Sequence, residues 1–231
     1  LGIPPVVAVG SEAPHVLATS VSGFIAHWRK KNVDIKMGVF LLIGGIIGST
    51  VGVNLFSYLK TYGQIDLVIQ LLFIFFLGFI GFSMAFESAK TTISQYRSMN
   101  LKRGKLHQHS WFHGLPFKIR FHRSKLYISA MPPVIIGFIV GIMSAMMGVG
   151  GGFIMIPAMV YILGMPTSVV VGTSLFQIIF VTANATFFQS YINYNVDIVL
   201  SGLMIFGGVI GAQIGVILGS KLKAEYLRGI L

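Results

Sequence analysis

The sequence predicts an all-α polytopic membrane protein made of two homologous helical halves. Hydrophobic residues make up 55% of the 231 residues and charged residues only 10%, whereas soluble domains carry about 25% charged residues. Several apolar runs are long enough to cross a bilayer, which takes about 20 residues of helix. Short motifs from the first half of the chain also recur, in the same order, in the second half.

Five apolar runs are the predicted membrane-spanning helices. They are Val6–Trp28, Met37–Tyr58, Leu67–Phe86, Val169–Tyr191 and Ile198–Gly219. A sixth apolar region, Met131–Leu163, would be about 50 Å long as one helix, well beyond the roughly 30 Å hydrocarbon core of a bilayer. Four glycines lie in its middle, within Gly148–Gly152, and each weakens a helix by about 1 kcal/mol relative to alanine. We therefore expect this region to form a broken or re-entrant helix.

The two halves are related by an internal repeat. Three motifs recur: "LGIPPVVAVG" (1–10) as "LGMPTSVVVG" (163–172), "NVDI" (32–35) as "NVDI" (195–198), and "GGIIGSTVG" (44–52) as "GGVIGAQIG" (207–215). The offset is 162 positions at the first motif and 163 at the later two, so one residue is inserted between them. Three matches in the same order indicate a duplication, which defines the architecture of the whole chain.

The repeat sets the expected domain boundaries. The first repeat covers 1–87, a basic loop covers 88–126, and the second repeat covers 127–231. The Gly-rich segment Met131–Ile162 precedes only the second copy, and the span Leu67–Phe86 follows only the first. We therefore expect the chain to be a piece that lacks one element at each end.

One segment of the second repeat resembles a known family signature. The run "GVGGGFIMIPAMVYILGMPTSVVVGTSL" (Gly148–Leu175) is similar to the sulfite exporter TauE/SafE family, in which a glycine cluster, a proline, an "LG.P" turn and an "A/G-T-S" triplet follow in this order. The first copy departs from it, because Gly10-Ser11-Glu12 stands where the second copy has Gly172-Thr173-Ser174. The resemblance implies a multi-pass carrier of the bacterial inner membrane for sulfur-containing or organic anions, sulfite- or sulfonate-like, and it leaves the substrate open.

Lysine and arginine are concentrated between the repeats. Nine of the 17 basic residues lie between Lys90 and Lys125, a segment without Asp or Glu, and the positive-inside rule places such a loop in the cytoplasm. If Met131–Leu163 crosses once, 13 of the 17 basic residues are cytoplasmic; if it enters and returns, only Lys60 is external. Both arrangements are acceptable. The second, with inverted repeats, is favoured because the equivalent loops 27–34 and 190–197 then have opposite charge bias.

The glycine cluster is the main candidate for a substrate-binding site. Irregular backbone at membrane depth is tolerated where it is buried in protein or lines a cavity, and broken helices mark the binding sites of transporters. A half-helix starting near its last glycine would direct N–H groups and a partial positive charge at an anion. The candidate residues are Gly148, Gly150, Gly151, Gly152 and the downstream Pro157. The alternative role of these glycines is close packing between helices.

Polar side chains at a similar depth complete the candidate site. Hydroxyl and amide groups can donate hydrogen bonds to a sulfite or sulfonate without placing a charge in lipid. The candidates are Thr173, Ser174, Gln177 and Asn184 in the second repeat, and Ser11 and Thr19 in the first. Hydrogen bonding between helices is their alternative role.

Glu12 is the acidic residue predicted within a span near this site, and His15 follows it by three positions. A carboxylate inside a membrane is costly and is a functional candidate by default. We expect Glu12 and His15 to couple transport to protons; the alternative is that Glu12 lies hydrated at headgroup level.

Other classes of function are disfavoured by what the chain contains. No nucleotide P-loop, paired-carboxylate or Ser/His/Asp pattern is present, so we expect neither an enzyme nor a cofactor. The loop histidines His107, His109, His113 and His122 lie among lysines without acidic partners, so we expect no metal site. The basic loop has no nucleic-acid-binding module, and anionic lipid is its expected partner. A non-transporting membrane scaffold or sensor subunit is the alternative to a secondary transporter, and oligomeric state is left open.

Overall fold

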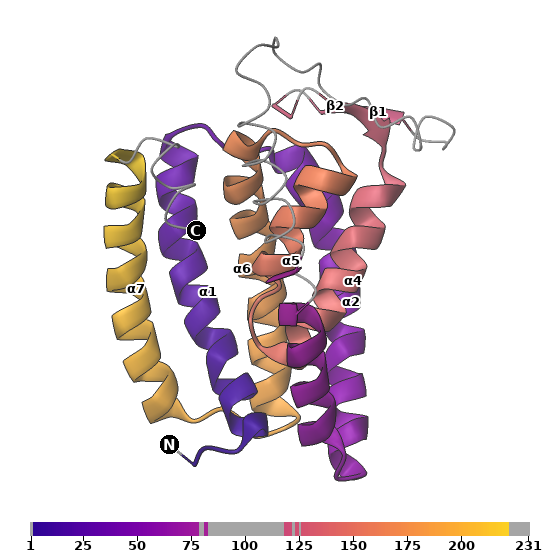
Figure 1. The fold of residues 1–231 in the computed structure, drawn as a ribbon, viewed down its shortest axis with the longest axis vertical. Helices are drawn as coiled ribbons and strands as arrows, with labels where there is room; N and C mark the ends of the chain where they lie inside the picture. Colours follow the sequence, from indigo (N-terminus) through magenta and orange to yellow (C-terminus); the bar gives the residue numbers. More distant parts are fainter. Residues whose placement is uncertain (1, 79–80, 83–117, 122, 125, 222–231) are drawn as a thin grey trace.

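Long helices lying side by side make up most of the molecule (Figure 1). The structure is a computed structural model that describes residues 2–78, 81–82, 118–121, 123–124 and 126–221. The helices are α1 (Pro5–Arg29), α2 (Ile35–Thr61), a helix over Ile65–Gly78, α4 (Met131–Met147), α5 (Gly152–Pro157), the π-helix η2 (Ala158–Ile162), α6 (Thr167–Tyr191) and α7 (Ile198–Lys221). Two short strands, β1 (Lys118–Phe121) and β2 (Leu126–Ser129), form an antiparallel hairpin before α4.

Three of these helices are long and apolar enough to cross a membrane. They are α2, α6 and the part of α7 over Ile198–Ile217. Their outward faces carry large exposed apolar side chains, including Ile47, Phe187 and Phe206, a surface that soluble proteins rarely present. The expectation of a mostly helical, polytopic membrane protein is therefore confirmed. Helices α1, α2, α6 and α7 begin and end within a few residues of the predicted spans, whereas the predicted span Leu67–Phe86 is described only through Gly78 and at 81–82.

The recurring "NVDI" motif starts the second long helix of each half. Asp34 Oδ1 accepts a hydrogen bond from Met37 N at 3.2 Å, and Asp197 Oδ1 accepts one from Leu200 N at 2.9 Å. Each aspartate thereby satisfies one of the backbone N–H groups that the first turn of a helix leaves without a partner. The same short motif therefore fixes the start of α2 and the start of α7.

The apolar region Met131–Leu163 is interrupted at its glycines. Helix α4 ends at Met147 and is capped by Gly148, whose φ is +77°. Gly150 and Gly151 have φ of +69° and +70° before α5 begins at Gly152. Such positive φ angles are readily accessible only to glycine. The sequence therefore uses glycine where the chain leaves one helix and starts the next.

The chain returns after this turn to the end from which it came. One hydrophobic cluster contains Ile136 from α4, Met159 from η2 and Val170 from α6, together with Met37 at the start of α2. The first part of α4 and the end of η2 therefore both lie beside the start of α2. Pro157 lies between the two parts of the returning limb; because proline lacks an N–H and crowds the preceding turn, the helix widens there into the π-helix η2.

The β-hairpin is a departure from the predicted all-α fold. Lys118 pairs with Ser129 and Phe121 with Leu126 across the hairpin. Phe121 is fully buried in the cluster at the start of α2 and contacts the ring of Phe40 edge-on. Side chains alternate between the two faces of a strand, so Ile119 and Phe121 of β1 pack on the helices while Arg120 between them is exposed. The hairpin was not predicted, because the many basic residues of 88–126 are typical of a loop.

Glycines let α2 and α4 approach closely. A Cβ atom added at Gly44, Gly48 or Gly52 on α2 would run into the backbone of Val134, Phe138 or Ile142 on α4. Helices in membranes commonly associate through such small residues. At the repeat-equivalent positions of α7, Gly207, Gly211 and Gly215, an added Cβ atom meets nothing within 4 Å among the described residues. These three positions of the motif therefore permit close helix packing in its first copy, whereas in the second copy it is Gly208 that lies against a neighbouring helix, at His15 of α1.

Gly48→Ala should destabilise the protein far more than Gly211→Ala, although the two glycines occupy equivalent positions. The first substitution overpacks the contact with the Phe138 backbone, which costs about 1–3 kcal/mol or more; the second adds a methyl group in open space and should cost less than about 0.5 kcal/mol. Unfolding of the two purified variants in detergent measures the difference. Equal losses of stability would contradict this account of α2 and α4.

Candidate functional site

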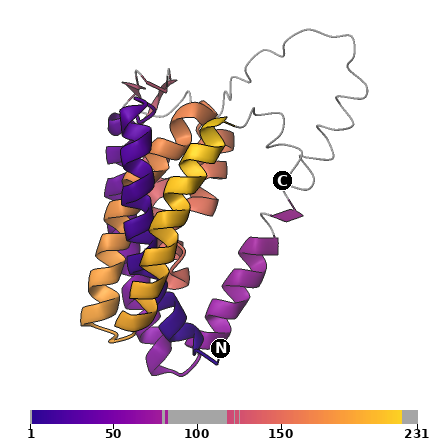
Figure 2. The ribbon, with the colours of Figure 1, turned by 90° about the vertical axis from the view of Figure 1, so that its left-hand side faces the viewer.

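The equivalent helices of the two halves run in opposite directions. Gly23 near the end of α1 lies against Leu175 near the start of α6, and Gly10 near the start of α1 lies against Asn195 just after α6. Helices α1 and α6 are therefore antiparallel. Helix α7 runs alongside α1 in the same direction, and α2 runs alongside α6 (Figure 1). Figure 2 shows that the helix over Ile65–Gly78 leans away from this group.

Contacts between the halves occur in matched pairs. The backbone N–H of Asp34 donates to Thr173 Oγ1 at 2.9 Å, and the backbone N–H of Asp197 donates to Ser11 Oγ at 2.9 Å. Ser11 is the repeat equivalent of Thr173, and Asp34 is the equivalent of Asp197. Each half therefore gives the other the same hydrogen bond, one at each end of the interface.

The matched pairs continue towards the middle of the helices. The Asn184 amide donates to Thr50 Oγ1 at 3.1 Å, and the Gln213 amide donates to Ser22 Oγ at 2.6 Å; Ser22 is equivalent to Asn184, and Thr50 to Gln213. The same two repeat positions therefore meet twice across the interface, once in each sense.

Equivalent polar side chains face equivalent glycines between these hydrogen bonds. A Cβ atom added at Gly45 would contact the Gln177 amide, and one added at Gly208 would contact the His15 ring. His15 and Gln177 are themselves repeat equivalents. The two halves thus place different chemistry at one repeated position, an imidazole in the first and an amide in the second.

The glycine turn between α4 and α5 lies where the two halves meet. A Cβ atom added at Gly150 would contact Val16 of α1 and both Ile178 and Thr182 of α6. Val16 and Ile178 are repeat equivalents, so the turn touches the same position of both copies. Because Ile178 and Thr182 lie in the middle of α6, the turn sits at about half the length of that helix, and Gly148, Gly150 and Gly151 are buried there.

Backbone donors gather at this turn. The recorded hydrogen bonds here run from Gly148 N to Ser144 O and from Ile154 N and Met155 N to Gly151 O. Within the described part of the chain, no recorded bond uses the N–H groups of residues 150–153 as donors. A helix start leaves its first N–H groups without intrahelical partners and gives them a partial positive charge. The arrangement can therefore accept a negatively charged group.

The buried polar side chains without a partner include one on α6, next in sequence to Ile178, and one on α4 beside Gly151. Gln177 is fully buried, and neither atom of its amide has a hydrogen-bond partner. The buried hydroxyl of Ser144 also lacks one, and its Cβ atom lies 3.5 Å from a Cβ placed on Gly151. Ser144 was not predicted; its sequence signal is that it is the only hydroxyl-bearing residue of α4.

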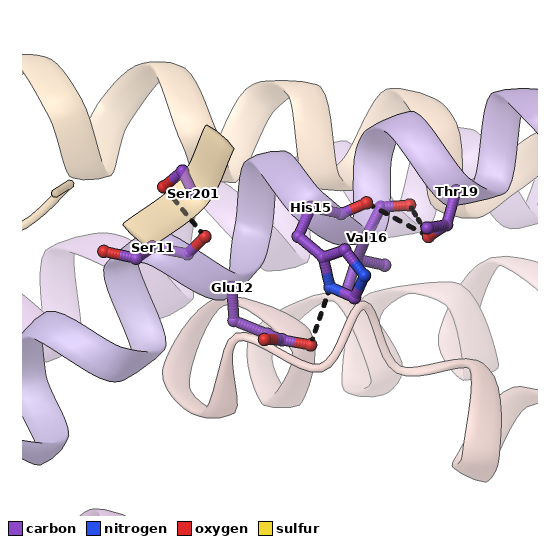
Figure 3. A network of polar contacts seen from close by, with 6 residues as sticks. All are labelled: Ser11, Glu12, His15, Val16, Thr19 and Ser201. Carbon is purple, nitrogen blue, oxygen red and sulfur yellow. Dashed lines mark hydrogen bonds and ion pairs between the residues drawn. The ribbon is translucent and has the colours of Figure 1, made fainter. Parts of the chain in front are cut away.

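Glu12 and His15 form a pair beside the turn. His15 Nδ1 lies 3.1 Å from Glu12 Oε1, and their side chains are 21% and 28% exposed, respectively. They lie on α1 between Val9 and Val16, which contact Gly148 and Gly150. Figure 3 shows the two side chains turned towards each other on α1, and the Ser201 hydroxyl of α7 donating to the Ser11 carbonyl. The His15 ring also lies against Gly208 of α7.

The remaining predicted residues have local partners. Thr19 donates to the His15 and Val16 carbonyls, Ser174 donates to the Val171 carbonyl, and Thr173 also donates to the Val169 carbonyl. Pro157 lies at the end of α5, away from the turn. The structure therefore pairs Glu12 with His15 on the helix whose Val9 and Val16 contact the glycine turn, and uses Ser11, Thr173 and Asn184 between the halves.

Two cavities accompany this interface. One of about 490 Å³ lies between α1 and the second half of α6, with Leu17, Thr186 and Tyr191 in its lining. The other, of about 500 Å³, lies at the end that carries the β-hairpin. Neither lining includes a glycine of the turn, whose surroundings are filled by valine and isoleucine side chains.

The basic loop is described only around its β-hairpin. The histidines His107, His109, His113 and His122 lie outside the described residues. Among the residues that are described, no group of three or more His, Asp or Glu side chains could hold a metal ion.

Comparison with known proteins identifies the family. The whole chain, residues 1–231, matches the family described as sulfite exporter TauE/SafE. "Probable membrane transporter protein YjnA" of Bacillus subtilis is 26% identical over the full chain and 82% of its own length, and "Probable membrane transporter protein YunE" of the same organism is 24% identical over 96% of the chain and 75% of its own length. A "Probable membrane transporter protein" of Xylella fastidiosa is 24% identical over 96% of the chain and 72% of its length.

No solved structure matches the chain. The family is one of membrane transporters and not a class of enzymes. With a family match along its entire length and helices suited to a bilayer, the chain belongs to the sulfite exporter TauE/SafE family of multi-pass membrane transporters.

Proposed function

We propose that this protein is a secondary transporter that moves a small anion across the bacterial inner membrane through a site at the interface of its two halves. The observation that carries the proposal is the glycine turn at mid-depth, which touches equivalent positions of both copies and presents backbone N–H groups without recorded partners. An anion at this turn would meet donors held in place by the surrounding helices, without a fixed positive side chain in lipid.

We further propose that the two halves are inverted repeats. The antiparallel course of α1 and α6 and the exchanged hydrogen bonds at Asp34 and Asp197 support a two-fold axis in the membrane plane. The interrupted region then enters and leaves on one side as a re-entrant hairpin. Its non-helical backbone is enclosed by α1 and α6, which is the condition for such backbone at membrane depth.

The substrate that we propose is a sulfite- or sulfonate-like ion or a small organic anion, moved outwards. The family's description as sulfite exporters supports this class. The Gln177 amide and the Ser144 hydroxyl lack partners in this structure, and buried polar groups without partners are costly. Substrate oxygen atoms that accept hydrogen bonds from Gln177 Nε2 and the Ser144 hydroxyl would remove part of that cost.

Glu12 and His15 are proposed to couple anion movement to protons. An anion at the turn would lie near the Glu12 carboxylate and be repelled by it, unless the carboxylate is protonated or its charge is balanced by a protonated His15. Proton binding and anion binding would therefore favour each other.

Gly151→Val should reduce anion flux at least about tenfold in proteoliposomes. The side chain would occupy the approach to the turn at a positive φ and displace Val140, and the lost hydrogen bonds to a charged group correspond to about an order of magnitude or more. Sulfite and sulfonate flux is measured per molecule of folded protein. Gly202→Val is the control, because an added Cβ atom meets nothing within 4 Å there among the described residues.

Gln177→Met separates binding from folding in the same assay. If the amide is only an unsatisfied buried group, the apolar replacement should leave both stability and flux intact or improved. Lost flux with unchanged stability is the outcome we expect. Undiminished flux in both Gly151→Val and Gln177→Met would refute the site, and no flux of any anion by the intact protein would favour the scaffold or sensor alternative.

Topology reporters test the inverted arrangement. A reporter fused after Tyr194 should be external, and reporters fused near Lys105 or after Lys223 should be cytoplasmic, because the end carrying most of the basic residues is then inside. The measurement is the activity of a compartment-dependent reporter enzyme in cells. If both halves faced the same way, the Tyr194 fusion would be cytoplasmic and the Lys223 fusion external. That result would show that the inverted arrangement is wrong.

Glu12→Gln should abolish the stimulation of anion flux by an imposed pH gradient while leaving flux down an anion gradient measurable. The amide keeps the shape of the carboxyl group but cannot titrate. Asp66→Asn is the matched control, since Asp66 is exposed at the start of the helix over Ile65–Gly78. An unchanged response to the pH gradient in Glu12→Gln would rule out the coupling role.

A further inference from the structure

The cavity of about 500 Å³ lies between the α1–α2 connection and the turn of the β-hairpin. We call it the basic pocket. Its lining includes Trp28, Arg29, Lys31, Asp34, Lys36 and Arg123. Of these, only Arg123 belongs to the basic loop, so the pocket joins cationic residues from two distant parts of the sequence.

The charge of the basic pocket is strongly positive. Four of its lining side chains are cationic, and Asp34 is the one carboxylate. Asp34 is 2% exposed, and its oxygens accept hydrogen bonds from Met37 N, from Ser124 N at 3.0 Å and from Ser124 Oγ at 2.6 Å. Within the described residues, none of the four cations has a recorded ion pair. The pocket therefore holds cations that its own carboxylate does not pair with.

The two sides of the basic pocket are held together before any ligand arrives. Arg123 Nη1 donates to the Lys31 carbonyl, and Asp34 bonds to Ser124 next to Arg123 in the chain. A guanidinium has five N–H donors in a planar fork, so one bond to a carbonyl leaves donors for a phosphate group. This fork geometry suits phosphate oxygens better than a lysine ammonium does.

The basic pocket also borders the apolar surface that faces lipid. Trp28 in its lining is 50% exposed and Ile35 is 45% exposed, and Ile25 and Val39, one turn further along their helices, are 46% and 40% exposed. Tryptophan is enriched at the boundary between hydrocarbon and headgroups. A soluble anion needs no such apolar border, whereas a lipid presents an anionic headgroup and an acyl chain side by side.

We propose that the basic pocket binds the phosphate headgroup of an anionic phospholipid. Arg123 and Lys36 contact the phosphate oxygens, Arg29 and Lys31 add to the positive potential, and the acyl chains lie along Trp28 and Ile35. The expectation of anionic lipid near the basic loop thereby becomes a defined site at the α1–α2 connection. This site is separate from the glycine turn, so it does not depend on the transported substrate.

The test compares lipid binding by paired variants of the purified full chain, using native mass spectrometry after delipidation. Phosphatidylglycerol should bind the wild type in preference to phosphatidylcholine. Arg123→Gln with Lys36→Gln should weaken phosphatidylglycerol binding by at least about tenfold, because each charge-assisted hydrogen bond corresponds to about an order of magnitude. The control is Arg120→Gln with Lys30→Gln, two exposed cations of the same hairpin and the same connection that do not line the pocket. This pair should change binding less than about twofold.

Lys36→Gln alone separates loss of binding from loss of folding. No hydrogen bond joins the Lys36 side chain to another residue in the described structure, so removing its charge should weaken lipid binding and leave the thermal unfolding temperature unchanged. Equal binding by the pocket and control pairs would overturn the proposal. Inorganic phosphate that binds the pocket as tightly as phosphatidylglycerol would also overturn it, since the ligand would then be a soluble anion.

Discussion

A backbone that leaves helical geometry inside a bilayer must be enclosed by protein, because lipid offers no hydrogen-bond partners. In the re-entrant arrangement that we propose, that constraint acts at Gly148–Gly151, between α4 and α5. Helices α1 and α6 close around the turn through Val16 and Ile178, and α4 can lie close enough to α2 to support it only because glycines line their contact. The positions of α1, α2, α4 and α6 thus follow from the need to shield a few peptide groups from lipid.

The sequence predicted the structure best at positions where few residue types suit the local backbone or environment. The interruption of the helix at the glycine cluster and the apolar runs of bilayer length were readable in advance. The repeat was readable too, since its motifs are the capping and packing positions themselves. These features are local, and their chemistry is nearly the same in any fold.

Features that depend on tertiary contacts were not readable. Phe121 in a basic segment gave no sign that it completes the cluster at the start of α2. Thr173 and Ser11 were placed among substrate-binding candidates, yet each accepts a backbone hydrogen bond from the opposite half. Gln177 and Thr173 both read as polar residues in an apolar helix. Only the three-dimensional arrangement separates a hydroxyl that has a partner from an amide that has none.

The two copies share the same arrangement of helices but differ in their titratable groups. Glu12 and His15 in α1 correspond to Ser174 and Gln177 in α6. If both halves were chemically identical, each could adopt the conformation of the other. The two resulting conformations of the protein, one open to each side of the membrane, would then have equal energy. Under the proton-coupled mechanism that we propose, an ionisable pair at this position of one half would make proton uptake favour one of these conformations over the other. The acidity on each side of the membrane would then bias the direction in which the protein works.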